Sequence, residues 1–300
     1  MLSEHDINIT GFRGTLLRHE PMSRHTSLKV GGPADIYAVP QDLADLLTLV
    51  TWLDRNQIGR MAVGGGYNLL VRDGGIRGAV ISLERLNGIE QLGNGRVKAW
   101  AGADNLQVVR FAQQLGLGGI GFISGIPGTI GGAVRMNAGA YGNGLLEHSA
   151  SLTVLRDGKA QELPMTSFSY GYRRLELQPG DLILAVTLQL DEVDPAVTEE
   201  EIRKDLELRR TKHNVGFPSA GSFFKNPAGQ SAWQLIDAAG MRGFQVGAAQ
   251  MAELHSNFMI NRGGATAGDC LELARQVQQA VLHTTGVSLE PEVRIVGEEP

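Results

Sequence analysis

Apolar side chains recur at helical spacing in several stretches of the chain, and these stretches predict its helices. Residues 41–57 show the pattern most clearly, with apolar positions at Leu43, Leu46, Leu47, Val50 and Leu53. The same spacing predicts further helices over residues 105–115, 232–239 and 269–283. Thr198 and Glu201 are spaced as a capping box, which predicts the start of a charged helix that runs to about Thr211.

Short apolar runs between these helices predict strands. They lie at residues 61–63, 78–83, 96–101, 151–155, 182–190, 257–260 and 292–296. A chain of 300 residues is about twice the ~150 residues expected of one domain. We therefore predict an α+β protein in three parts, residues 1–85, 86–194 and 195–300, with a linker near residues 191–195.

Glycine is the outlier in the composition, at 40 of the 300 residues, which is about twice the usual ~7%. Because glycine shows no three-residue period, collagen is excluded. The chain is 42% hydrophobic and 20% charged, which excludes wholesale disorder. Two clusters stand out, residues 64–75 and residues 116–144, and the second holds eleven glycines in 29 residues.

Two explanations are open for the glycine clusters. They are tight turns between short strands, or they are cradles in which backbone N–H groups converge on the anionic oxygens of a nucleotide. Two long clusters joined by α/β units favour the nucleotide cradle. Neither Gly64-x-Gly66 nor Gly119-x-Gly121 continues as a Rossmann fingerprint, because Leu69 and Ser124 stand at the third glycine position, and the chain has no P-loop.

Charge and cysteine content exclude several other classes. The net charge of −5 and pI near 5.8 argue against a nucleic-acid binder, which needs a basic surface. The single cysteine, Cys270, fits a reducing cytoplasm and cannot form an internal disulfide or a cysteine zinc site. The seven histidines show no metal-ligand spacing. The longest uncharged run, residues 111–134, is glycine-rich and is not expected to cross a membrane.

Several motifs in order carry a resemblance to a known family. They are TSLKVGGPAD (26–35), VGGGYNLLVRD (63–73), SGIPGTIGGAVRMNAGAYG (124–142), YGYR (170–173), SAGSFFKNP (219–227), HSNFMIN (255–261) and EPEVR (290–294). With these motifs over nearly its whole length, the chain resembles the UDP-N-acetylenolpyruvoylglucosamine reductase family, the flavoenzymes of peptidoglycan and cell-wall synthesis. At 300 residues it is similar to the shorter family type, which lacks an inserted tyrosine-bearing loop.

The resemblance implies a fold and a cofactor. Two N-terminal subdomains, residues 1–85 and 86–194, would clamp non-covalent FAD in a PCMH-like arrangement, and residues 195–300 would form an α/β substrate-binding domain. NADPH would reduce the FAD, although the sequence does not decide between NADPH and NADH. The implied cofactor-binding residues are Gly64, Gly65, Gly66, Tyr67, Asn68, Leu69, Ser124, Gly125, Ile126, Pro127, Gly128, Gly131, Gly132, Asn137, Gly139, Ala140 and Tyr141.

The resemblance also implies three catalytic residues in an NADPH-dependent UDP-N-acetylmuramate dehydrogenase. Arg173 would stabilise the enolate that develops on the substrate carboxylate, with Arg174 as the alternative. Ser222 would donate a proton to the carbanionic carbon. Glu292 would orient or protonate the enolate carboxylate, with Glu290 as its competitor.

Further residues are implied in substrate binding: Tyr172, Lys212, Lys225 and Asn226, with Arg209 or Arg210 as alternatives to Lys212 for the diphosphate. We expect a cytoplasmic monomer that binds small molecules and no metal, nucleic acid or membrane. Two other functions stay open. One is a flavoenzyme with the same clamp, such as an oxidase of small alcohols or lactones, and the other is a nucleotide-binding regulatory module without catalysis.

Overall fold

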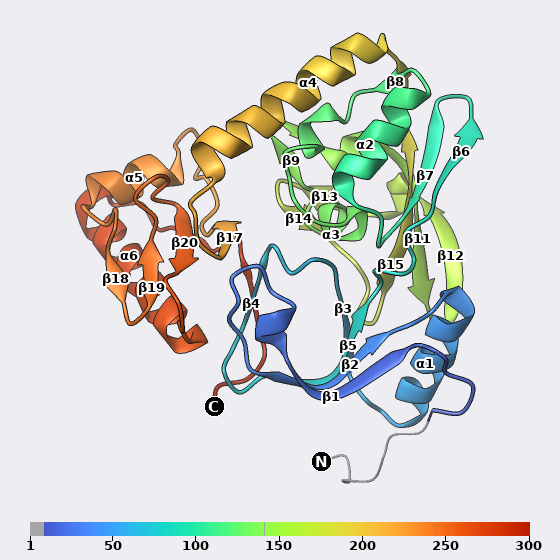
Figure 1. Cartoon of the computed structure of the whole chain (residues 1–300), viewed down its shortest axis with the longest axis horizontal. Coiled ribbons are helices and arrows are strands. Elements are labelled where there is room, and N and C mark those ends of the chain that lie inside the picture. The colour runs from blue at the N-terminus through green and yellow to red at the C-terminus, as the bar shows by residue number, and fades with distance from the viewer. Residues whose placement is uncertain (1–8, 141) are drawn as a thin grey trace.

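The computed structural model describes residues 9–140 and 142–300, and its elements form three successive groups (Figure 1). The first group is a four-stranded sheet in the order β1-β2-β5-β3, parallel except between β1 and β2. Helix α1 connects β2 to β3, and its apolar face packs on the sheet. The bounds are β1 Thr15–Pro21, β2 Pro33–Val39, α1 Leu43–Arg55, β3 Arg60–Val63, β4 Leu69–Val71 and β5 Ile76–Ser82.

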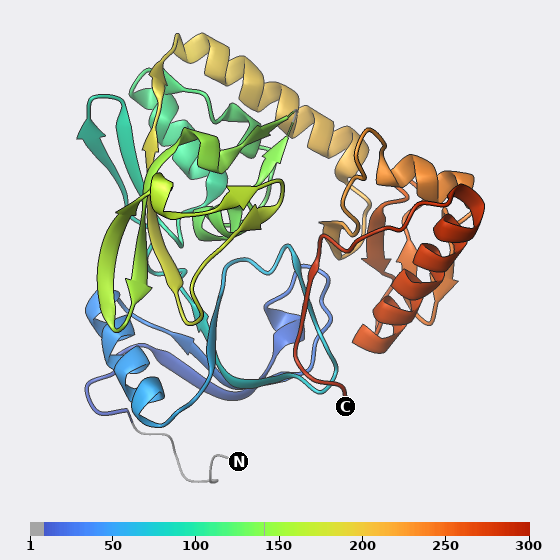
Figure 2. The ribbon, with the colours of Figure 1, turned by 180° about the vertical axis from the view of Figure 1, so that it is seen from behind.

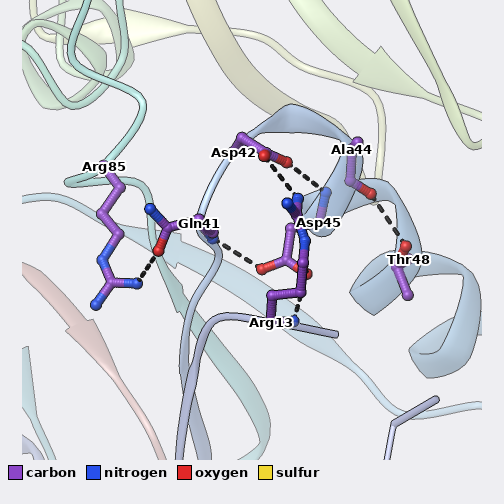
Figure 3. Close-up of polar contacts among 7 residues, drawn as sticks. All are labelled: Arg13, Gln41, Asp42, Ala44, Asp45, Thr48 and Arg85. Atoms are coloured by element: carbon purple, nitrogen blue, oxygen red, sulfur yellow. Dashed lines mark hydrogen bonds and ion pairs between the residues drawn. The ribbon is translucent and has the colours of Figure 1, made fainter. Parts of the chain in front are cut away.

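The start of α1 is fixed by two carboxylates (Figure 3). Asp42 is the N-cap residue, and its side chain accepts the backbone N–H of Asp45 at 2.9 Å. Asp45 in turn accepts the backbone N–H groups of Arg13 at 2.7 Å and Gln41 at 2.8 Å. The Asp42 carboxylate therefore satisfies a donor that a helix start leaves without a partner, and the Asp45 carboxylate binds the segments at Arg13 and Gln41 to the helix.

The second group is a five-stranded antiparallel sheet in the order β12-β11-β15-β7-β6. Helices α2 and α3 pack with this sheet in one large apolar core. The bounds are β6 Ile89–Gly93, β7 Arg96–Trp100, α2 Asn105–Gln114, β8 Leu117–Gly118, α3 Ile130–Arg135, β9 Gly139–Ala140, β10 Asn143–Gly144, β11 Ser149–Arg156, β12 Lys159–Pro164, β13 Tyr170–Gly171, β14 Arg174–Leu175, β15 Leu182–Gln189 and β16 Asp191–Glu192.

The third group is a four-stranded antiparallel sheet in the order β17-β20-β19-β18, with α5 and α6 packed on it. A long helix, α4, runs from the second group to the third (Figure 1) and continues as a π-helical turn over Arg209–His213. The bounds are α4 Pro195–Leu208, β17 Ser219–Ser222, α5 Ala232–Ala238, β18 Gln245–Val246, β19 Ala249–Met251, β20 Phe258–Asn261, α6 Ala267–Thr285 and β21 Arg294–Val296.

The third group is bound to the first in two ways. Strand β21 returns to pair in parallel with β4, and Figure 2 shows the C-terminal segment (red) beside the first group of elements (blue to cyan). The core of the third group also takes in Leu28, Val30 and Leu70. In contrast, Ile202 of α4 is buried in the core of the second group. The division at residues 85 and 194 stays a prediction.

The predicted helices at 41–57, 105–115, 232–239 and 269–283 are confirmed with small changes at their ends, as are the predicted strands. The capping box at Thr198 is wrong, because α4 begins at Pro195 and its N-cap is Asp194, whose side chain accepts the N–H of Ala196 at 2.9 Å. The structure has further elements that the sequence did not predict, among them strands β1, β2, β6 and β12 and the short helix α3. Within residues 9–140 and 142–300, no helix is long and apolar enough to span a bilayer.

Candidate active site

A cavity of about 1160 Å³ is lined by residues from all three groups. Pockets for single small ligands run to about 1,000 Å³, so this cavity has room for a dinucleotide together with part of a second ligand. Both glycine clusters contribute to its wall, through Gly64–Leu69 and through residues 125–129, 131 and 132. The carboxyl end of β3 leads directly into the first cluster.

The two glycine clusters touch each other at the cavity wall. A Cβ on Gly64 would collide with the hydroxyl oxygen of Thr129, and one on Gly66 would collide with the carbonyl oxygen of His25. Gly66 also has φ +66°, a conformation that favours glycine. Close packing within the chain therefore leaves no room for a side chain at Gly64 or Gly66, which both the turn explanation and the cradle explanation allow.

Asn105, the first residue of α2, fixes the second glycine cluster. Its side-chain amide donates to the carbonyl of Ile126 at 3.0 Å, and its backbone N–H donates to the carbonyl of Gly128 at 3.1 Å. Asn105 is buried and lines the cavity, yet its Oδ1 has no hydrogen-bond partner among the described residues. The hydroxyl of buried Ser124 also has none there. Of the two, only Asn105 lines the cavity, so its Oδ1 is the candidate partner for a polar ligand or water.

The remaining predicted cofactor residues are Ser124, Asn137, Gly139, Ala140 and Tyr141, and only some of them reach the cavity. Ser124 is buried beside the lining residue Gly125 without lining the cavity itself. Asn137 supports the backbone, since its side chain accepts from Leu146 N at 3.0 Å and donates to Gly171 O at 3.0 Å. Gly139 lines the cavity, whereas Ala140 is the second residue of β9 and Tyr141 lies outside the described residues.

Arg173 and Glu292 meet at the cavity wall, although 119 positions separate them in the chain. Arg173 Nε donates to Glu292 Oε1 at 2.8 Å, and Nη2 donates to the carbonyl of Gly139 at 2.9 Å. Arg173 is the second residue of the two-residue turn between β13 and β14, with φ +54°. Glycine usually occupies such a turn position.

Glu292 is partly exposed only toward the cavity, with 16% of its side chain accessible. Burial raises its pKa, and the neighbouring charges of Arg173 and Lys225 oppose that rise without cancelling it. The buried carboxyl thus retains its proton to a higher pH than an exposed glutamate does. When it is protonated, such a carboxyl can donate a hydrogen bond.

Ser222, the last residue of β17, lines the same cavity. Its hydroxyl has no hydrogen-bond partner among the residues that the structure describes. The structure thus brings Arg173, Ser222 and Glu292 to one cavity, as predicted, and leaves the Ser222 hydroxyl available to a ligand.

The predicted substrate residues lie away from the lining. Lys225 pairs with Glu290, with 3.2 Å between Nζ and Oε2, and the Asn226 side chain accepts the Ala232 N–H at the start of α5. Lys212 is exposed in the π-helical turn, and Tyr172 is exposed against the guanidinium of Arg173. Arg209 and Arg210 from this turn do line the cavity.

Several cavity-lining residues carry polar or charged groups that the sequence did not single out for the site, among them Asn105, Thr129, Arg135 and Arg294. Arg294 ends the motif EPEVR, and Arg135 and Thr129 lie inside SGIPGTIGGAVRMNAGAYG. Their position inside these motifs is therefore the sequence feature that could have identified these three residues. No sequence feature marks Asn105 as a site residue, because it begins an ordinary amphipathic helix. The described residues hold no cluster of three potential metal ligands.

Comparisons with known proteins match two family models. Residues 34–163 match a model described as an FAD binding domain, and residues 212–296 match one described as the C-terminal domain of UDP-N-acetylenolpyruvoylglucosamine reductase. The two matches fall on the two sides of the cavity. The first includes both glycine clusters with their joining elements, and the second includes Ser222 and Glu292.

Whole proteins are similar over nearly the full chain. The UDP-N-acetylenolpyruvoylglucosamine reductase of Pelobacter propionicus is 64% identical over 295 residues, which cover 98% of this chain and 100% of the relative. That of Geobacter metallireducens is 53% identical, with 96% of each chain covered. A crystal structure of the reductase from Thermus caldophilus superposes with a TM-score of 0.81 at 31% identity, covering 94% of this chain and 98% of the other.

Proposed function

The chain belongs to the UDP-N-acetylenolpyruvoylglucosamine reductase family, and from this we propose that it reduces UDP-N-acetylenolpyruvoylglucosamine to UDP-N-acetylmuramate. It is an FAD-dependent oxidoreductase, and NADPH is the co-substrate of its family. The product enters peptidoglycan synthesis. The fold is the α+β architecture of an FAD-binding part and a reductase C-terminal domain.

The cavity residues fit FAD. Gly64, Gly66 and Gly128 bring backbone close to the cavity where any Cβ would collide with a neighbour or need an unfavourable φ. Such backbone can approach a pyrophosphate. The unpartnered Oδ1 of buried Asn105 supports a polar ligand at the same wall. We assign the two glycine clusters, with Tyr67, Asn68 and Ile126, to FAD. When bound, FAD supplies the hydride that reduces the substrate double bond.

Arg173 and Glu292 act on the substrate carboxylate in this proposal. Negative charge accumulates there as the double bond is reduced, and preorganised donors that face it lower the barrier. The permanent charge of Arg173 is held in place by Glu292 and Gly139. Burial raises the pKa of Glu292, and in this proposal its protonated carboxyl donates a hydrogen bond to the same group.

Several observations support Arg173 over its neighbour Arg174. Arg174 is exposed and pairs with Glu176 at 2.7 Å, whereas Arg173 lines the cavity in a left-handed turn conformation. Such a conformation costs a non-glycine residue about 1–2 kcal/mol and is found at sites where function requires it. Glu292 is favoured over Glu290 for the same reason, since Glu290 pairs outside the cavity with Lys225.

Ser222 supplies the proton to the second carbon in this proposal. Its hydroxyl lines the cavity without a competing partner in the described part of the chain. A serine hydroxyl is a weak acid, so nearby positive charge must stabilise the alkoxide that forms. Arg173 and Lys225 are the cations whose charge reaches Glu292 in the same region.

Arg209 and Arg210 are the better candidates for the substrate diphosphate. Both line the cavity, while Lys212, Lys225, Asn226 and Tyr172 do not. The four could reach a ligand only through side-chain or domain movement, and their role in substrate binding remains a proposal. Arg210 already pairs with Glu207 at 2.8 Å. Arg209 makes no ion pair with a described residue, so its charge is more readily available to a diphosphate.

The chain acts on small molecules. We propose that it does so as a monomer in the cytoplasm, and the net charge of −5 supports small-molecule substrates over nucleic acid. Size-exclusion chromatography with light scattering tests the monomer directly, because a dimer would double the mass of 32.2 kDa.

The convergence of both glycine clusters with Arg173, Ser222 and Glu292 on one cavity carries the proposal. Purified protein should be yellow and should lose that colour when NADPH is added without oxygen. Protein that binds no flavin, or flavin that NADPH does not bleach, would contradict the proposal. An alcohol or lactone oxidase would instead be bleached by its own substrate.

A further inference from the structure

Besides Arg209, two guanidinium groups on the cavity wall have no carboxylate partner among the described residues. Arg135, the last residue of α3, and Arg294, the first residue of β21, both line the cavity. Neither makes an ion pair with any residue in the described ranges, whereas Arg60, Arg173 and Arg210 on the same wall each have an acidic partner.

The two arginines also lie close enough to repel each other. Burial and the charge of Arg294 lower the pKa of Arg135. Arg135 is half-buried, and Nη1 donates only to the carbonyl of Leu175 at 2.9 Å. Two cations that face one cavity without a counter-charge create a favourable position for an anion.

The neighbours of the pair locate this position. Arg294 donates its backbone N–H to Asn68 O at 3.1 Å in the first glycine cluster, and Glu292 is two residues before it. Arg135 lies within the second glycine cluster, and its partner Leu175 is two residues after Arg173. The pair therefore connects the two glycine clusters with the segments that carry Arg173 and Glu292.

A cofactor held by these loops must place its reactive ring in this region to reach the substrate. When the C–H bond of the reduced nicotinamide breaks, its electron pair and hydrogen pass together to the isoalloxazine ring. The ring, uncharged before this transfer, then carries one negative charge, and the nicotinamide becomes positive. Positive charge near the ring favours the reduced form and raises its reduction potential.

We propose that Arg135 and Arg294 form an anion site that holds the negative charge of the reduced flavin ring. The inference rests on the proposed function, because it requires bound FAD. It assigns a role to two residues outside the Arg173, Ser222 and Glu292 group. Their charge sets how readily the flavin accepts electrons from NADPH.

The test is the reduction potential of the bound FAD, measured by dye-linked titration with dithionite. Removing one charge, in Arg135→Gln or Arg294→Gln, should shift the equilibrium about tenfold toward oxidised flavin. For a two-electron couple, tenfold corresponds to about 30 mV, toward more negative potential. The double variant should show a larger shift than either single variant.

Matched variants separate charge from structure. Arg135→Lys keeps the charge but changes the hydrogen bond to Leu175, so its potential should stay near that of the unchanged protein. Arg110→Gln removes a cation on α2 that pairs with Glu199 at the surface, and it should not shift the potential. Arg294 is exposed, so Arg294→Gln is expected to fold and to retain FAD even if Arg135→Gln does not.

Unchanged potential in Arg294→Gln, with FAD fully bound, overturns the proposal. A changed KM for the enolpyruvyl substrate at unchanged potential also overturns it, because the pair would then bind substrate. The titration requires neither NADPH turnover nor substrate. If NADPH bleaches the unchanged protein and substrate restores the colour, the proposed function stands whatever the potentials show.

Discussion

Arg173 occupies a backbone conformation in which glycine is usual, and three hydrogen bonds hold its guanidinium there. They run to Glu292, Asn137 and Gly139. Arg174, one residue later, faces outward to Glu176. A two-residue turn thus separates two chemically identical side chains, one at the cavity and one at the surface.

This separation predicts different outcomes for two matched substitutions. Arg173→Gln should lower kcat/KM about 10²–10³-fold, the usual loss when one preorganised charge-stabilising group is removed. Arg174→Gln removes an exposed ion pair and should change kcat/KM less than twofold. Steady-state kinetics with NADPH and the enolpyruvyl substrate compares the two, and a reversed order would move the role to Arg174.

The raised pKa of Glu292 predicts a pH effect on the rate. Protonated Glu292 donates to the substrate carboxylate, so kcat should fall as pH rises through the pKa of Glu292 in the folded protein. The free energy of unfolding should also fall as pH rises through this pKa. A carboxyl whose pKa is raised by folding contributes most to stability at low pH and loses that contribution as it ionises. Glu292→Gln should lower kcat and abolish this fall of kcat with rising pH. If the fall persists in the variant, the titration belongs to another group.

Sequence reasoning reached the catalytic residues only through the family motifs. Residue type and spacing alone left Arg173 and Arg174 equivalent, and likewise Glu290 and Glu292. What separates each pair is the direction of the side chain, which depends on a turn and on the pairing of distant strands. The same limit explains why Tyr172, Lys212, Lys225 and Asn226 lie off the cavity lining.

At the scale of elements, helices with a strong apolar face were predicted within a few residues. Helix α1 is buried at Leu46, Leu49, Val50 and Leu53, as its pattern requires. Helix α3 was missed, since its sequence IGGAVR holds two glycines and is only six residues long. It is helical because Ile130, Ala133 and Val134 pack into the core of the second group. Tertiary packing overrides propensity here.

The capping box at Thr198 failed for a local reason. Proline is well suited to the first turn of a helix, and Pro195 follows an aspartate that caps the same turn. Thr198 is buried one turn inside α4. The Asp194–Pro195 pair is therefore the stronger signal for the start of a helix, although the sequence analysis predicts a linker there.

The first glycine turn predicts a substitution that removes the cofactor. Gly66→Ala adds a Cβ that would collide with the His25 carbonyl and strains a left-handed residue by about 1–2 kcal/mol. We expect this variant to be purified with much less FAD, as measured by its visible absorbance. Gly59→Ala is the control, because a Cβ there meets nothing within 4 Å. Equal FAD content in both variants would contradict a close approach at Gly66.

At the scale of the whole molecule, the third group is anchored to the first. Asp73, after β4, accepts the N–H groups of Ala267 at 2.9 Å and Gly268 at 2.8 Å at the start of α6. Asn261 donates to the carbonyl of Leu28 at 3.1 Å. Together with the β4–β21 pair, these contacts hold Ser222 and Glu292 against the cofactor loops. The local sequence does not predict such contacts, because the partners are about 200 residues apart.

Asp73→Ala should weaken this anchor. Loss of a capping carboxylate costs about 1 kcal/mol, which urea denaturation would detect as a lower free energy of unfolding. Amide exchange in the first turn of α6 should also become faster. Asp73→Asn keeps one acceptor oxygen, so its free energy of unfolding should lie between those of the unchanged protein and Asp73→Ala. Unchanged exchange in Asp73→Ala would show that the apolar core alone holds the third group in place.

The assignment of one cavity to both flavin and enolpyruvyl substrate is tested most directly by anaerobic reoxidation. Protein bleached by NADPH should regain its yellow colour when UDP-N-acetylenolpyruvoylglucosamine is added, with formation of UDP-N-acetylmuramate. Ser222→Ala should be bleached normally but regain colour at least about 10²-fold more slowly, because the proton donor is absent. If the unchanged protein stays bleached, the substrate assignment is wrong. If Ser222→Ala recovers at the normal rate, the proton comes from another group.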